Sequence, residues 1–131
     1  MSLIDSSAWI ELFRATGSPT HERLRAALSS AEELVSTEPV AMELLAGARD
    51  PRQRRLIKGS LAACRMVSVE NAGDWEAAAG IYLRCRMAGA TPRRLLDCLI
   101  AAVAIRAAVP ILAQDRDYEL IAEHTPLELA P

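Results

Sequence analysis

Short apolar runs alternate along the chain with longer stretches in which apolar residues recur every three or four positions. The short runs predict strands, and recurrence at helical spacing predicts amphipathic helices. The expected strands are residues 2–4, 34–36, 66–69, 110–113 and 127–129. The expected helices are residues 6–13, 18–28, 37–47, 50–63, 71–87, 91–107 and a short one that begins at 118. Because alternating strands and helices imply parallel βαβ units, the expected fold class is α/β, with a parallel β-sheet covered by helices on both faces.

Prolines and glycines mark several of these helix boundaries. Three pairs place a proline at the first helical position, where its missing N–H is not needed. These pairs are Ser18-Pro19, Asp50-Pro51 and Thr91-Pro92. Gly47 ends the expected helix 37–47, and Gly89 lies just beyond the end of the helix 71–87, since glycine is favoured at helix ends.

Length and composition narrow the class of protein. The chain has 131 residues, of which 51% are hydrophobic, so it fits one domain, residues 1–131, with a core that needs no disulfides. Cys64, Cys85 and Cys98 are isolated from one another in the sequence, which argues against a disulfide framework or a zinc knuckle. We see no signal peptide and no apolar run long enough to span a membrane. A cytoplasmic protein without membrane contact is therefore expected.

Two carboxylates stand where a carboxylate is energetically unfavourable. Asp97 is the only charge among residues 95–105, a stretch that is apolar all round and should be buried. Glu43 likewise interrupts the apolar segment 40–46. An unpaired buried carboxylate costs several kcal/mol, so these residues need partners. The simpler alternatives are an ion pair of Asp97 with Arg93 or Arg94, and a solvated helix face around Glu43.

Three further acids follow strands. Asp5 follows the first strand, and Asp115 and Asp117 follow the strand at 110–113. Each of them has a simple alternative role as a helix cap or turn residue. In an open parallel sheet, however, ligands bind outside the carboxyl ends of the strands, and acids gathered there would repel one another. A hard divalent cation would relieve that repulsion, and all-oxygen ligation suits Mg²⁺ or Mn²⁺.

Four segments resemble motifs of the PIN-domain family, in particular of its VapC-type ribonuclease toxins. They are DSSAWI at residues 5–10, PVAMEL at 39–44, LLDCLIA at 95–101 and AQDRDY at 113–118. They occur in the family's order and with ordinary spacing over the whole chain. Gln114 departs from the pattern, since many members have Ser, Thr or Asn there, which puts a direct role for this position in doubt.

The resemblance implies a PIN-like fold and metal-dependent endoribonuclease activity. By position, it implies that four acids form the catalytic, metal-holding cluster, with Asp117 as an added or outer ligand and Ser7 as a supporting hydrogen-bond donor. The four acids are Asp5, Glu43, Asp97 and Asp115. It also implies Mg²⁺ as the cofactor with Mn²⁺ as a substitute, a toxin homodimer, and inhibition by a small VapB-like antitoxin from a type II toxin–antitoxin (VapBC) pair.

An acid-only site has no histidine to act as general acid or base, so the metal must supply the nucleophile and the electrostatic stabilisation. Hydrolysis should then leave 5′-phosphate and 3′-hydroxyl ends. Cations must hold the RNA, and two blocks offer them, one from Arg49 to Arg65 and one from Arg84 to Arg94. We expect Arg93 and Arg94, which lead into the Asp97 helix, to bind RNA. The alternative for both blocks is a solvated helix face.

Other acidic-pocket proteins fit the sequence less well. A phosphoacceptor receiver domain needs a lysine near its late strands, whereas Lys58, the only lysine, lies mid-chain. A haloacid-dehalogenase-like phosphatase needs Asp-x-Asp after the first strand, where this chain has Asp5-Ser6-Ser7. A catalytically silent PIN-like module that binds RNA or protein would have lost one of the four acids, and none is missing.

Overall fold

A parallel sheet of four strands forms the centre of the computed structural model, which describes residues 1–131. The strands are β1 (Ser2–Ile4), β2 (Leu34–Ser36), β3 (Arg65–Met66) and β4 (Ile111–Leu112). Their order across the sheet is β3-β2-β1-β4. Leu3 of β1 lies opposite Val35 of β2 on one side and Ile111 of β4 on the other. The parallel sheet predicted from the sequence is therefore confirmed, with β1 and β2 at the predicted bounds.

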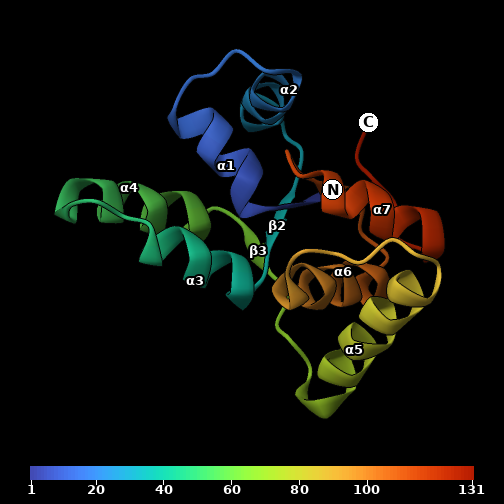
Figure 1. Cartoon of the computed structure of the whole chain (residues 1–131). Coiled ribbons are helices and arrows are strands. Elements are labelled where there is room, and N and C mark those ends of the chain that lie inside the picture. Colours follow the sequence, from blue (N-terminus) through green and yellow to red (C-terminus); the bar gives the residue numbers. More distant parts are fainter.

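Seven helices surround the sheet. They are α1 (Ser6–Phe13), α2 (Pro19–Leu28), α3 (Glu38–Ala46), α4 (Pro51–Ala62), α5 (Asn71–Met87), α6 (Leu95–Ala107) and α7 (Arg116–His124). Figure 1 shows α1 and α2 on one side of the strands and α5 and α6 on the other, while α3 and α4 form a hairpin that reaches to the left. No helix combines the length and the apolar character that a membrane crossing requires.

Side-chain caps begin four of the helices, and two of them, Ser18 and Asp50, stand where the sequence predicts helix starts. Asp5 accepts a hydrogen bond from the backbone N–H of Ser7, and Asp115 accepts one from Asp117. Ser18 and Asp50 cap α2 and α4 in the same way. Each cap satisfies a backbone donor that the helix leaves unpaired. Asp5 and Asp115 thus fix where α1 and α7 begin relative to β1 and β4.

The predicted start of the sixth helix at Thr91-Pro92 is wrong, because α6 begins only at Leu95. Residues 91–94 stay irregular instead of forming the first turn of the helix. The backbone N–H of Arg93 donates to the Asp117 carboxylate at 3.0 Å, and Arg94 adopts an extended conformation as the N-cap. A side chain from α7, distant in the sequence, therefore replaces the local start signal of the proline.

Smaller differences lie at the edges of the fold. β3 ends at Met66, so the predicted strand 66–69 is mostly loop, and α7 begins at Arg116 rather than at 118. At the C-terminus, the predicted strand 127–129 contributes a single parallel bridge between Leu129 and Ile111. The helix predicted from 71 begins there, with Glu70 as its N-cap.

The core is formed mainly by the sheet, the first turns of α1 and helix α6. Every residue of α6 from Asp97 to Ala104 is buried, as the uniformly apolar pattern predicts. This helix packs against α5 and α7. Trp9 of α1 and Tyr118 of α7 are the largest fully buried side chains. Because α6 is buried on all sides, Asp97 reaches the interior of the protein.

A second buried acid, Asp74 of α5, is neutralised by Arg106 at the end of α6. The guanidinium of Arg106 contacts both carboxylate oxygens of Asp74 at 2.9–3.2 Å and donates to the Ser68 carbonyl at 2.7 Å. The Asp74 side chain is only 4% exposed. The hydrogen bond from Arg106 holds the pKa of Asp74 below its ordinary value, although burial opposes this.

Arg106→Ala should lower the free energy of unfolding by about 1.5–3 kcal/mol at neutral pH, because it leaves a buried carboxylate without its charged donor. Since Asp74 has a lowered pKa in the folded state, the pair stabilises the fold above pH ~4 and is lost as pH falls further. The difference between variant and wild type should therefore shrink in acid. Urea unfolding at several pH values measures it, with Arg86→Ala on the exposed face of α5 as control. Equal stability of the two variants at neutral pH would contradict the prediction.

Candidate metal and active site

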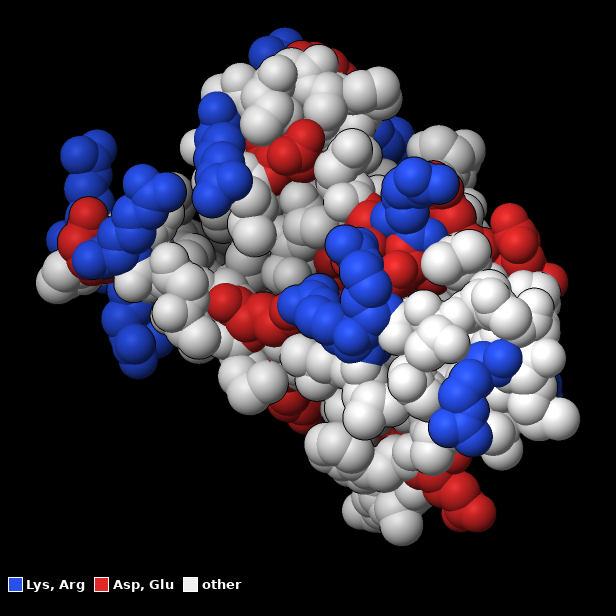
Figure 2. All heavy atoms as spheres, viewed as in Figure 1, with Lys and Arg blue, Asp and Glu red and all other residues white.

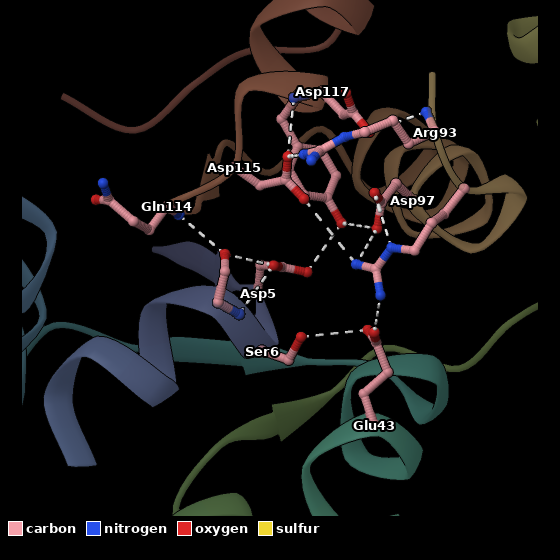
Figure 3. A network of polar contacts seen from close by, with 11 residues as sticks. Asp5, Ser6, Glu43, Arg93, Asp97, Gln114, Asp115 and Asp117 are labelled. Carbon is pink, nitrogen blue, oxygen red and sulfur yellow. Dashed lines mark hydrogen bonds and ion pairs between the residues drawn. The ribbon is translucent and has the colours of Figure 1, made fainter. Parts of the chain in front are cut away.

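Five acidic side chains from distant parts of the chain meet at the carboxyl ends of β1 and β4 (Figure 3). Asp5 directly follows β1, and Asp115 lies three residues after the end of the neighbouring strand β4. Asp97 reaches the same place from the first turn of α6, Asp117 from α7 and Glu43 from α3. The structure thus brings together all the acids that the sequence analysis selected.

Burial makes it unfavourable for all the acids of this cluster to be ionised at once. Asp5 and Asp97 are fully buried, and Asp117 is 4% exposed. Glu43 and Asp115 keep only a small exposed part of their side chains. Several carboxylates in so little water disfavour one another's ionised forms, so the site needs compensating positive charge.

Asp97, Asp115 and Asp117 form the tightest group, with one carboxylate oxygen from each lying within 4.8 Å of the others. Asp117, expected as an added or outer ligand, belongs to this compact group. Glu43 is linked to Asp97 through Arg94, and Asp5 through Tyr118. All donors are oxygens, and no histidine or cysteine takes part. Such a donor set fits a hard cation such as Mg²⁺ or Mn²⁺.

Two arginines supply positive charge to the cluster. Arg94 contacts Glu43 at 2.8 Å and Asp97 at 2.9 Å, and its guanidinium lies 4.0 Å from Asp115. Arg93 bridges Asp115 at 2.8 Å and Asp117 at 3.2 Å. The ion pair of Asp97 with a neighbouring arginine, considered as an alternative to a cluster, exists inside the cluster, so the two interpretations are compatible. Both arginines are at least half exposed, so their charges also face solvent.

Two serines at the start of α1 orient acids of the site. The Ser7 hydroxyl lies 2.6 Å from a carboxylate oxygen of Asp5, to which it donates, and accepts the backbone N–H of Gln114 at 2.9 Å. Ser6 donates to Glu43 at 3.3 Å. The side chain of Gln114 points away from the acids (Figure 3) and accepts a hydrogen bond from Thr20 of α2. Gln114 thus meets the site only through its backbone.

Tyr118 is a site residue that the sequence analysis missed as a contributor of chemistry. Its hydroxyl donates to Asp5 at 2.8 Å, and Asp97 lies 3.4 Å from the same oxygen. Burial raises the pKa of Tyr118 well above its ordinary value, and the charges of Asp5 and Asp97 add to the effect. The hydroxyl therefore stays protonated and remains a donor between two acids. The only signal in the sequence was a tyrosine three residues after Asp115, where a phenylalanine would pack equally well.

Desolvation dominates the protonation of Asp97. Burial raises the pKa of Asp97 from 3.8 to about 6, and the charges of Asp5 and Asp115 act in the same direction, while Arg94 opposes them. Between pH ~4 and ~6 the folded protein therefore holds a proton that the unfolded chain has released. Ionising Asp97 in the folded state weakens the fold unless further positive charge compensates it.

Comparison with known proteins places this geometry in a family. Residues 2–124 match the PIN domain, and the chain belongs to the PIN-domain family. It is 44% identical over 131 residues to VapC ribonuclease Mb1587 of Mycobacterium bovis and to ribonuclease VapC11 of Mycobacterium tuberculosis. Each of these alignments covers 99% of this chain and 98% of the relative.

Solved structures share the fold at lower identity. The crystal structure of Mycobacterium tuberculosis VapC20, a sarcin-ricin loop cleaving toxin, superposes with a TM-score of 0.72 at 20% identity and covers both chains fully. FitAB bound to a DNA fragment gives a TM-score of 0.76 at 18% identity, covering 99% of this chain and 94% of the other. A toxin–antitoxin complex from Klebsiella pneumoniae gives 0.72 at 19% identity, covering 98% and 100%. At these identities the likeness establishes the PIN-like fold alone.

The raised pKa of Asp97 predicts a difference in pH dependence between wild type and Asp97→Asn. In EDTA, wild type should lose about 2 kcal/mol of unfolding free energy relative to the variant as pH rises from 4 to 7, because the pKa of Asp97 is raised from 3.8 to about 6 in the folded state. Denaturant titrations of both proteins across this range measure the difference. Asp50→Asn, which changes an exposed helix cap, serves as control. Parallel curves for wild type and Asp97→Asn would contradict the prediction.

The hydroxyl of Tyr118 predicts a second effect, on cation affinity. Tyr118→Phe keeps the ring but removes the donor that orients Asp5, so it should weaken Mn²⁺ binding about tenfold, as losses of outer hydrogen bonds to metal ligands do. Calorimetric titration with Mn²⁺ measures this independently of activity. Tyr82→Phe on α5, away from the acids, is the matched control. Affinities equal to wild type in both variants would show that the hydroxyl does not position Asp5.

Proposed function

We propose that this protein is a divalent-cation-dependent endoribonuclease that acts as the toxin of a toxin–antitoxin pair. The observation that carries the proposal is the convergence of Asp5, Glu43, Asp97 and Asp115 at the carboxyl ends of two adjacent parallel strands, with Glu43 on α3, Asp97 on α6 and the other two in the segments after β1 and β4. Full-length relatives at 44% identity are named ribonucleases, which supports RNA as the substrate class.

Those four acids would hold Mg²⁺, or Mn²⁺ in its place. Asp117 would add a carboxylate beside Asp97 and Asp115, the closest group of the cluster. When bound, such a cation activates water for attack on a phosphodiester and stabilises negative charge on the phosphate. The protein's own part is to orient the ligands. Ser7 holds one oxygen of Asp5 and Tyr118 holds the other, so the Asp5 carboxylate is fixed from two sides.

Arg93 and Arg94 would bind the RNA phosphate next to the cleaved bond. Their guanidinium groups lie at the mouth of the cluster, half exposed or more, and arginine suits paired phosphate oxygens. A cation bound by the acids would take over the positive charge that these arginines supply to Glu43, Asp97 and Asp115. The arginines would then be free to exchange their carboxylate partners for phosphate oxygens.

The expected partners and location follow from the same family. A small VapB-like antitoxin would inhibit the enzyme, as structural neighbours include toxin–antitoxin complexes, and two copies of the chain would form a homodimer. The three cysteines are unpaired, a state that a reducing cytoplasm would maintain. Residues 1–131 would act as a single catalytic domain.

Asp97→Asn should abolish RNA cleavage while leaving the fold intact, because the side chain keeps its shape and loses its charge. Wild type should cleave RNA in Mg²⁺ or Mn²⁺, stop in EDTA, and leave 5′-phosphate and 3′-hydroxyl ends. Gel assays with end-group analysis test both points, with Asp50→Asn as an active control. Undiminished cleavage in EDTA, or 2′,3′-cyclic phosphate ends, would exclude the mechanism. RNA binding without any cleavage would instead identify a silent PIN-like module.

A further inference from the structure

Helix α4 is only lightly attached to the rest of the fold. Ile57 is its one buried residue, and the helix occupies the far end of the α3–α4 hairpin (Figure 1). Its sequence, PRQRRLIKGSLA, contains four cations and no acid. Leu56 is its only large apolar side chain exposed to solvent. Packing does not explain this charge, because all four cations lie on the exposed surface.

The four cations of α4 also lack partners within the protein. None of them, Arg52, Arg54, Arg55 and Lys58, forms an ion pair, whereas six of the other arginines do. Arg49, just before the helix, is equally free of carboxylate contacts within 4.0 Å. In Figure 2 the blue atoms at the left, where α4 lies, have only a small red area among them, while those at the centre lie against the larger red area of the acidic cluster. Four adjacent cations repel one another, so an external polyanion would bind here favourably.

A hollow joins this helix to the acidic site. It has a volume of about 280 Å³ and lies between α1, α3 and the start of α4. Glu43 of the site lines one part, and Arg49, Gln53 and Ile57 line another, with Arg14 of α1 also present. A chain that leaves the acidic cluster past Glu43 therefore meets positive charge at Arg14 and Arg49, and α4 begins two residues after Arg49.

We propose that the cationic face of α4 binds the backbone of the RNA substrate on one side of the cleaved bond. The proposal rests on the proposed ribonuclease function and adds a second contact region to it. Arg93 and Arg94 lie against the acids of the cluster, so the phosphates within their reach are those next to the cleaved bond. Binding that extends over several nucleotides needs unpaired cations, and α4 presents four of them in adjacent turns. Phosphate contacts of this kind set affinity and position without reading sequence.

A pair of charge-matched variants tests the proposal. Arg52→Gln with Arg55→Gln removes two cations from α4, and Arg23→Gln with Arg25→Gln removes two cations from α2, outside both basic blocks of the sequence. Both variants change the net charge equally and replace side chains that reach solvent. Binding of a labelled 20-nucleotide single-stranded RNA is measured in EDTA, which prevents cleavage, at several salt concentrations. Thermal melts confirm that both variants are folded.

The α4 variant should bind RNA more weakly, and the slope of log K against log salt should fall by about 1.4, or roughly 0.7 for each lost phosphate contact. The α2 variant should keep the wild-type slope. An unchanged slope in the α4 variant, or equal losses in both variants, would overturn the proposal. An α4 variant that binds RNA normally but escapes inhibition by the antitoxin would also overturn it and assign the helix to the protein partner.

The binding assay is independent of catalysis. If wild type cleaves RNA in Mg²⁺ while the α4 variant binds like wild type, only the role of α4 is wrong. If wild type cleaves no RNA under any condition, the proposed ribonuclease function fails whatever the slopes show.

Discussion

The burial of several carboxylates at one edge of the sheet is the constraint on which most of this structure depends. Asp5 and Asp97 have no exposed surface, yet neither is isolated. Asp97 accepts a hydrogen bond from the guanidinium of Arg94. Asp5 accepts hydrogen bonds from the hydroxyls of Ser7 and Tyr118, and the Tyr118 hydroxyl also lies next to Asp97. Without these donors the fold would have to protonate the acids or expose them, because unpaired buried charge is too unfavourable to persist.

This constraint also shapes the backbone around the site. Asp5 and Asp115 are helix caps and site acids at once, so the starts of α1 and α7 are fixed to the ends of β1 and β4. Asp117 holds the backbone N–H of Arg93 and thereby keeps residues 91–94 out of α6. The same interaction places Arg93 and Arg94 over the acids. Local structure and site electrostatics are therefore not separable here, because the irregular segment carries the two arginines that bring positive charge to the cluster.

Positive charge is divided between two regions with different roles. The arginines at the cluster compensate acids within the chain, and Arg106 does the same for Asp74. The cations of α4 compensate nothing within the chain. A net charge of −2 conceals this separation, which becomes visible only when each cation is followed to its partner. In a nuclease the two regions serve complementary needs, since the acids hold a cation and free arginines hold the polyanionic substrate.

Local patterns in the sequence predicted most of the elements and the acids that the fold brings together. Periodicity and proline-marked starts predicted the parallel sheet and most helices, because those signals act within a few residues of the chain. A charge inside an apolar helix singled out Asp97 and Glu43, since burial makes such a charge unfavourable without a partner. Local signals were insufficient at Thr91-Pro92, where a carboxylate from α7 decides the conformation. Only the tertiary structure showed the bridging hydroxyl of Tyr118, the inclusion of Asp117 in the compact group and the lack of partners on α4. Each of these depends on contacts between residues far apart in the sequence, and no pattern along the chain records which distant side chains come within hydrogen-bonding distance.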